Sequence, residues 1–310
     1  MKRFITHTVI FSFAFFIGVF LLILLADGSA DESYEKFSSP KQSALIVGSS
    51  RAGQGLIPEI LNSTLDEHSF YNYAFSIRNT PYGEPYYRSI KKKLDPETNN
   101  SGFIICVTPW TISATTEDPE DSLNYRELGS AIDRTHFVSM DPNIEYIIES
   151  YQQKNMNFIL KKFKKGDYQT FFVHDDGWLE VVIESDMIST KERTDNKVNS
   201  YRKKQKNEYT GVSQHRLKYL ERIIELLVPK GRVYLLRIPI NDDMYEIENL
   251  LDPQFDERMS AIAKKYNIHY INEMDTRAEY DYTDGHHLTI ESSKRFSKKI
   301  ADQIKAFDIE

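Results

Sequence analysis

Short apolar runs alternate with amphipathic helical patterns in this chain, and that alternation constrains the fold more than any other feature. Strands that alternate with helices favour a parallel sheet whose two faces are covered by helices. We therefore expect an α/β fold: a three-layer α/β/α sandwich with a parallel five-stranded sheet. The expected strands are residues 44–47, 70–75, 103–107, 233–236 and 268–271, and the expected helices include 82–94, 212–228, 253–266 and 289–307.

The N-terminal segment is apolar over a length that suits a lipid bilayer. Residues 8–26 are nineteen residues without a charge, preceded by Lys2 and Arg3. As a helix this run spans roughly 28 Å, close to the thickness of the hydrocarbon core. We expect a transmembrane anchor over 8–26, a cytoplasmic N-terminus over 1–7, and an extracytoplasmic remainder, either periplasmic or at the cell surface. A cleaved signal peptide is the alternative, because residues 28–30 read Gly-Ser-Ala.

The rest of the chain divides by composition. Residues 27–42 are polar and are expected to be a linker, and 43–310 form one α/β domain. Within that domain, residues 111–210 are charged with scattered apolar positions, which indicates an insertion or lid at the functional edge of the sheet. Its lysine runs, at 161–165 and 203–206, suit either an anionic polymer or lipid headgroup, or simply solvated helix faces.

Composition excludes several functional classes. The formal net charge is −7 and no basic block dominates, so we do not expect nucleic-acid binding. Cys106, the only cysteine, lies in an apolar run and is expected to be a packed core thiol. The sequence has no CxxC, no HExxH and no evident metal-ligand spacing, so we expect neither a metal nor an organic cofactor.

Two segments about 235 residues apart have the composition of one hydrolytic site. Gly48-Ser49-Ser50-Arg51 follows the first strand, and residues 284–289, Asp-Gly-His-His-Leu-Thr, lie between the last strand and the last helix. In parallel sheets such loops meet at the carboxyl edge. A hydroxyl nucleophile needs a base within hydrogen-bond reach and a carboxylate to orient that base. We expect Ser50, His287 and Asp284 in these roles; ordinary turns are the alternative for each segment alone.

These segments resemble the SGNH (GDSL-like) hydrolase superfamily, over roughly residues 43–110 and 212–307. The resemblance implies that Ser50 is the nucleophile in a Gly-Ser-Ser version of the usual Gly-Asp-Ser block. It also makes His287 the general base and Asp284 its orienter, in an Asp-x-x-His block. The segment Arg237-Ile238-Pro239 is similar to an Arg-x-Pro segment of some members.

The oxyanion-binding blocks depart from the family pattern. Ile77 stands where the family has a glycine, and residues 107–110 lack the usual asparagine. Asn79, Thr108 or a donor from the insertion are the candidate replacements. Arg51 and Arg237 are candidates for contact with an anionic substrate, with internal salt bridges as the alternative.

The divergent blocks and the anchor are similar to membrane-anchored branches of the superfamily that act on cell-surface polymers, in teichoic-acid D-alanylation and polysaccharide acetylation. The resemblance implies an exported serine esterase or O-acyltransferase acting on acyl groups of a surface glycan or polymer through an acyl-Ser50 intermediate, with a membrane-bound acyltransferase as a possible partner. Two alternatives remain open: a non-catalytic scaffold that binds a glycan or such a partner, and a lipid esterase.

Overall fold

The protein is built on one parallel sheet of five strands. A computed structural model describes residues 1–24, 31–65, 68–150, 171–183 and 187–309. The strands run in the order β2-β1-β3-β8-β9, with Leu45 opposite Phe103 and Tyr234 opposite His269, so the expected α/β fold with a parallel five-stranded sheet is confirmed. The strands are β1 (Ala44–Val47), β2 (Phe70–Asn72), β3 (Ser101–Cys106), β8 (Gly231–Arg237) and β9 (His269–Asn272).

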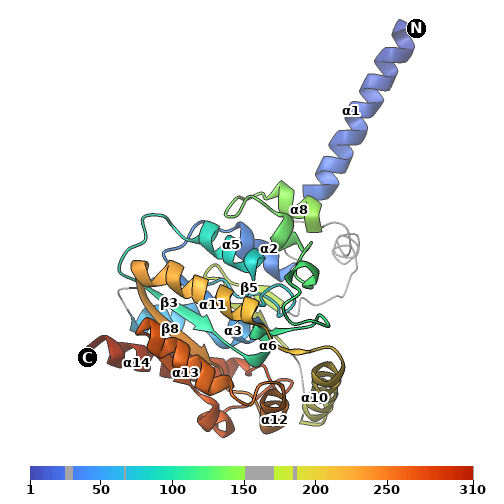
Figure 1. The fold of residues 1–310 in the computed structure, drawn as a ribbon. Helices are drawn as coiled ribbons and strands as arrows, with labels where there is room; N and C mark the ends of the chain where they lie inside the picture. The colour runs from blue at the N-terminus through green and yellow to red at the C-terminus, as the bar shows by residue number, and fades with distance from the viewer. Residues whose placement is uncertain (25–30, 66–67, 151–170, 184–186, 310) are drawn as a thin grey trace.

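Alternate residues of the central strands supply two separate hydrophobic clusters. Leu45 and Val47 belong to one cluster, whereas Ala44 and Ile46 belong to the other, because successive side chains of a strand point to opposite faces. The first cluster packs against α5 (Glu84–Lys93), α11 (Gln214–Leu227) and α13 (Phe255–Tyr266). The second packs against α3 (Ser50–Gly55), α4 (Pro58–Thr64) and α14 (Ile290–Ile309) (Figure 1).

Two local features set the bounds of the helices after β1 and the end of β2. Pro58 begins α4 and Ile57 before it is extended, as a residue preceding proline prefers, so the helical stretch after β1 is divided into α3 and α4. Strand β2 ends at Asn72 instead of continuing to residue 75. The Asn72 amide donates to the carbonyls of Ala52 (2.8 Å) and Leu56 (2.9 Å), which fixes the chain against α3.

Helix α1 (Lys2–Leu24) contains the expected apolar segment. Residues Lys2–Leu21 have a mean hydropathy of 2.1 and are long and apolar enough to cross a membrane. It is the one helix with these properties in the described part of the chain. The helix begins before residue 8, because the preceding residues continue the same helical hydrogen bonding.

The expected linker over 27–42 is more structured than its polar composition suggests. Its residues 32–38 form a helix, α2 (Glu32–Ser38), capped by the Asp31 side chain. Tyr34 and Phe37 are buried in the first hydrophobic cluster, and Lys36 donates to the carbonyl of Ala74 at 2.9 Å. The two aromatic side chains therefore draw this segment into the globular body.

Residues 111–210 contribute several short elements and one long helix. A hairpin is formed by β5 (Phe171–Val173), which pairs antiparallel with β6 (Leu179–Val181). The lysine run at 161–165 lies outside the described residues, whereas the run at 203–206 ends α10 (Met187–Asn207). The other described elements of the whole chain, several of them outside residues 111–210, are α6 (Pro109–Ile112), β4 (Ser113–Ala114), η1 (Ser122–Asn124), α7 (Ala131–Arg134), α8 (Ile144–Ser150), β7 (Gly211–Val212), η2 (Val228–Lys230), α12 (Asp242–Leu251) and η3 (Met274–Glu279).

Candidate active site

A glycine turn places Ser50 at the carboxyl edge of the sheet. Gly48 has φ +150°, and a Cβ there would lie 2.7 Å from the Cβ of Cys106 on the neighbouring strand, so only glycine fits without a shift of the strands. The Gly48 amide donates to the hydroxyl of Tyr86 at 2.9 Å. Ser49 is extended and serves as N-cap, which makes Ser50 the first residue of α3. The Ser50 hydroxyl is thus held, partly exposed, at a helix N-terminus.

The loop before α14 closes around the carboxylate of Asp284. Its Oδ1 accepts the backbone N–H groups of His286 (3.3 Å) and His287 (3.0 Å), and Gly285 supplies the positive φ of +89° that this turn needs. The amide of Thr283 donates to the carbonyl of His287 at 2.9 Å. These bonds fix the orientation of both acidic and imidazole side chains relative to the backbone.

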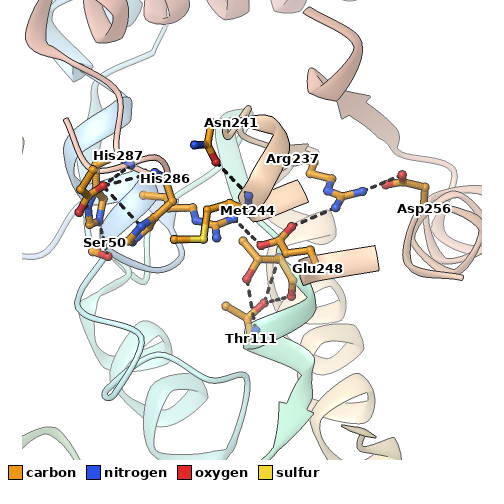
Figure 2. Close-up of polar contacts among 12 residues, drawn as sticks. Ser50, Thr111, Arg237, Asn241, Met244, Glu248, Asp256, His286 and His287 are labelled. Atoms are coloured by element: carbon orange, nitrogen blue, oxygen red, sulfur yellow. Dashed lines mark hydrogen bonds and ion pairs between the residues drawn. The ribbon is translucent and has the colours of Figure 1, made fainter. Parts of the chain in front are cut away.

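Ser50, His287 and Asp284 form one line of hydrogen bonds. The Oγ of Ser50 lies 2.9 Å from Nε2 of His287, and Nδ1 of His287 lies 3.0 Å from Oδ2 of Asp284 (Figure 2). An imidazole that donates from Nδ1 to the carboxylate presents an unprotonated Nε2 to the serine hydroxyl. The structure therefore brings together the three residues that the sequence suggests, in the geometry of a hydroxyl activated by a base.

Burial and charge act in opposite directions on Asp284. Burial alone would raise the pKa of its carboxyl, but the hydrogen bond and charge of His287, and the nearby His286 and Lys197, lower that pKa well below its usual range. The ammonium of Lys197, from α10, lies 3.3 Å from Oδ2. Asp284 is therefore held in its carboxylate form, the form that stabilises a positive imidazole ring.

His286 lies beside this line without belonging to it. Its ring is 3.9 Å from the ring of His287 and 5.0 Å from that of Tyr201, measured between centroids. Burial, and then the charge of His287, lowers the pKa of His286 well below its usual value. His286 is thus a buried, neutral ring that packs against the imidazole of His287.

The two arginines expected near the site are engaged in internal ion pairs. Arg51 lies 2.6 Å from Oε1 of Glu248, and Arg237 lies 3.0 Å from Oε2 of the same residue (Figure 2). Arg237 also pairs with Asp256 at 2.7 Å. Both guanidinium side chains are nearly fully buried, so the structure favours the salt-bridge alternative over contact with a substrate.

The candidate oxyanion donors are placed on two turns. Thr108 begins α6 and exchanges hydrogen bonds with Thr111: its N–H donates to Oγ1 of Thr111, and its own Oγ1 accepts the Thr111 N–H. The N–H of Asn79 donates to the carbonyl of Ser76, and the carbonyl of Ile77 accepts from Arg126. Among the described residues, none of the three is hydrogen-bonded to Ser50, His287 or Asp284.

Three residues around the site were not anticipated: Lys197, His286 and Glu248. Glu248 carried a signal, since it shares the buried face of α12 with Met244 and Ile247 at helical spacing. A charged residue on an otherwise apolar face needs a buried partner. No sequence pattern pointed to Lys197, because α10 carries charged residues along most of its length.

A metal ion is the alternative ligand to consider at this loop. The ligand atoms of Asp284, His286 and His287 lie within 4.8 Å of one another, close enough to share one ion. The positive Lys197 at 3.3 Å from Oδ2 opposes a cation there, and Nε2 of His287 already faces the Ser50 hydroxyl. The arrangement therefore suits proton transfer from a hydroxyl better than metal binding.

The candidate site is supported by its own residues and distances, because comparison with known proteins supplies no family. No protein-family model matches the chain, and no curated protein matches it.

Proposed function

We propose that the protein is a membrane-anchored serine esterase or O-acyltransferase. The single observation that carries the proposal is the hydrogen-bonded line from Ser50 through His287 to Asp284. Ser50 Oγ would attack an ester carbonyl while Nε2 of His287 takes its proton, and Asp284 would stabilise the imidazolium. The imidazolium would then protonate the leaving alkoxide. The acyl group on Ser50 would pass to water in an esterase, or to an acceptor hydroxyl in a transferase, with His287 again taking the proton.

We further propose a three-layer α/β/α sandwich of the SGNH type, with residues 111–210 as an insertion over the site. The strand order, the two hydrophobic clusters and the positions of Ser50 and the Asp-x-x-His loop support this assignment. Contacts from α10 to the catalytic loop support the lid: Arg193 donates to the carbonyl of Thr283 at 3.3 Å, and Lys197 pairs with Asp284.

The proposed location is a membrane, with α1 as a single-pass anchor and the globular domain outside the cytoplasm. The length and apolarity of α1 and the basic residues Lys2 and Arg3 support it. An extracytoplasmic esterase tethered in this way would meet polymers of the cell surface, so a surface glycan or related polymer is the proposed substrate.

A fluorophosphonate probe tests the nucleophile directly. The purified full-length protein should be labelled at Ser50, and Ser50→Ala should abolish labelling and lower ester turnover by about 10⁴-fold or more, with little change in unfolding free energy. Ser49→Ala is the matched control, because the Ser49 side chain makes no cap hydrogen bond. Labelling that persists in Ser50→Ala would contradict the assignment.

A non-catalytic scaffold, binding a glycan or a membrane acyltransferase, is the second candidate. The observation that favours it is at Thr108, whose N–H is already bonded to Thr111 and whose segment lacks the asparagine of the family. Losing one oxyanion donor costs about 10²–10³ in rate where it has been measured. Absence of probe labelling, with retained polymer binding, would favour the scaffold. Turnover of long-chain but not short-chain p-nitrophenyl esters would instead favour a lipid esterase.

A further inference from the structure

Four lysines from three separate segments surround one pocket at the amino edge of the sheet. Lys41 precedes β1, Lys91 and Lys92 lie in the last turn of α5, and Lys230 precedes β8. The pocket has a volume of about 450 Å³, and Phe137 completes its rim. Because the strands are parallel, this edge lies opposite the carboxyl edge that carries Ser50.

The four lysines of this pocket outnumber the single carboxylate, Asp95, among its lining residues. Lys92 and Lys230 donate to the backbone carbonyls of His136 (2.7 Å) and Pro96 (3.2 Å), and none of the four lysines forms a salt bridge with a described carboxylate. A helix C-terminus stabilises Lys91 and Lys92, but it does not explain why Lys41 and Lys230 converge on the same place. In a chain of net charge −7, this concentration indicates an anionic partner.

Phe137 gives the rim an apolar element beside the charges. Its side chain is 59% exposed, yet its backbone is held in place, since the N–H groups of His136 and Phe137 both donate to Oε2 of Glu145. An exposed aromatic ring among lysines is the composition of a surface that contacts the headgroup region of a bilayer.

The chain brings the lysine pocket close to the proposed anchor. Leu24, at the end of α1, and Asp31 are seven residues apart, so at most about 25 Å separates them. Asp31 accepts from the Tyr146 hydroxyl at 3.0 Å, and at the other end of α2 the amide of Ser139 donates to the Phe37 carbonyl. Helices α2, α5 and α8 lie on the side of the body nearest α1 (Figure 1).

We propose that the lysine pocket and Phe137 form a docking surface for anionic lipid headgroups of the membrane that holds α1. The proposal depends on the anchor in the proposed function but not on the chemistry of Ser50. Docking at the amino edge turns the carboxyl edge, and with it Ser50, away from the contacted leaflet. The site would then face a polymer outside the membrane and not the acyl chains of its own bilayer.

The test uses full-length protein in vesicles and one fluorescent label. Cys106 is buried, so a label on His136→Cys reports this surface alone and leaves Phe137 in place; the His136 side chain lines the same pocket and is 79% exposed. Quenching by nitroxide groups on lipid headgroups is measured in phosphatidylcholine vesicles with and without phosphatidylglycerol. Lys41→Glu with Lys91→Glu is introduced in the same background, because both side chains are exposed. Lys264→Glu with Lys305→Glu, at exposed positions of α13 and α14, is the control of equal charge.

Headgroup quenching should be strong with phosphatidylglycerol and weak without it. The Lys41/Lys91 pair should weaken the contact equilibrium by more than about 30-fold, since the loss of each lysine at an anionic surface costs roughly a five-fold factor and each new glutamate adds repulsion. The control pair should retain the quenching. Equal quenching in both lipids, or quenching unaffected by the Lys41/Lys91 pair, would overturn the docking surface. Protein that fails to float with the vesicles would overturn the anchor too, whereas fluorophosphonate labelling in the same sample tests Ser50 separately.

Discussion

Two polar networks lie at the carboxyl edge of the sheet, and they begin at the adjacent residues Ser50 and Arg51. From Ser50, a line of hydrogen bonds runs through His287 to Asp284. From Arg51, a line of ion pairs runs through Glu248 to Arg237 and Asp256. In the second network each oxygen of Glu248 faces a guanidinium, so its charges are fixed. In the first, the proton on Ser50 faces an imidazole that is able to accept it. One network supports the turn, and the other is the one to which we assign the proposed chemistry.

The largest effect on ester turnover is expected from a change at Asp284, in the first network. Asp284→Asn should lower ester turnover by about 10⁴-fold, because the amide no longer selects the imidazole tautomer that accepts a proton from Ser50. Unfolding free energy should change far less than activity. Steady-state kinetics with p-nitrophenyl acetate and denaturant unfolding measure both. The control is Asp281→Asn, whose side chain is 84% exposed. Turnover that survives in Asp284→Asn would show that this carboxylate does not orient the base.

The next largest effect should fall on stability. Glu248→Gln leaves the buried guanidinium of Arg51 without a counter-charge and should lower the unfolding free energy by about 3 kcal/mol. The folded fraction should still react with the fluorophosphonate probe. Glu246→Gln, on the exposed side of the same helix, should change neither quantity. If Glu248→Gln instead abolished labelling at unchanged stability, the ion network would have to be counted as part of the chemistry.

The sequence predicted the sheet because its central strands are buried on both faces and therefore appear as continuous apolar runs, as in Ala44–Val47. The proximity of Ser50 to the Asp284 loop followed from the rule that parallel strands share a carboxyl edge. Helix α2 was missed because a polar segment with two aromatic residues, Tyr34 and Phe37, has no clear helical period. Lys197 was missed because its partner depends on how α10 packs beside α12 and the Asp284 loop, which no local pattern encodes.

A smaller effect is expected from the neutral ring beside the reactive network. The pKa of His286 lies well below that of an exposed histidine, about 6.5, because of its burial and the charge of His287. Below pH 6.5 the unfolded chain binds a proton that the folded protein cannot, so stability should fall by roughly 1 kcal/mol per pH unit towards pH 5. His286→Phe keeps a ring in place and should remove that part of the pH dependence. His269→Phe, at an exposed position, should leave it unchanged.

The smallest effect should come from Lys197, whose ion pair joins α10 to the Asp284 loop. Its ammonium is one of the groups that lower the pKa of Asp284, so Lys197→Met makes the carboxylate a stronger partner for a positive imidazole. The acid limb of the kcat/KM profile should then move to higher pH as the free enzyme binds its proton more tightly, by up to about 0.7 pH unit at low salt. High salt should reduce the difference, because the Lys197 side chain is 35% exposed. Lys191→Met on the exposed face of α10 controls for the loss of one charge. A profile that does not move would mean that α10 covers the catalytic loop without tuning it.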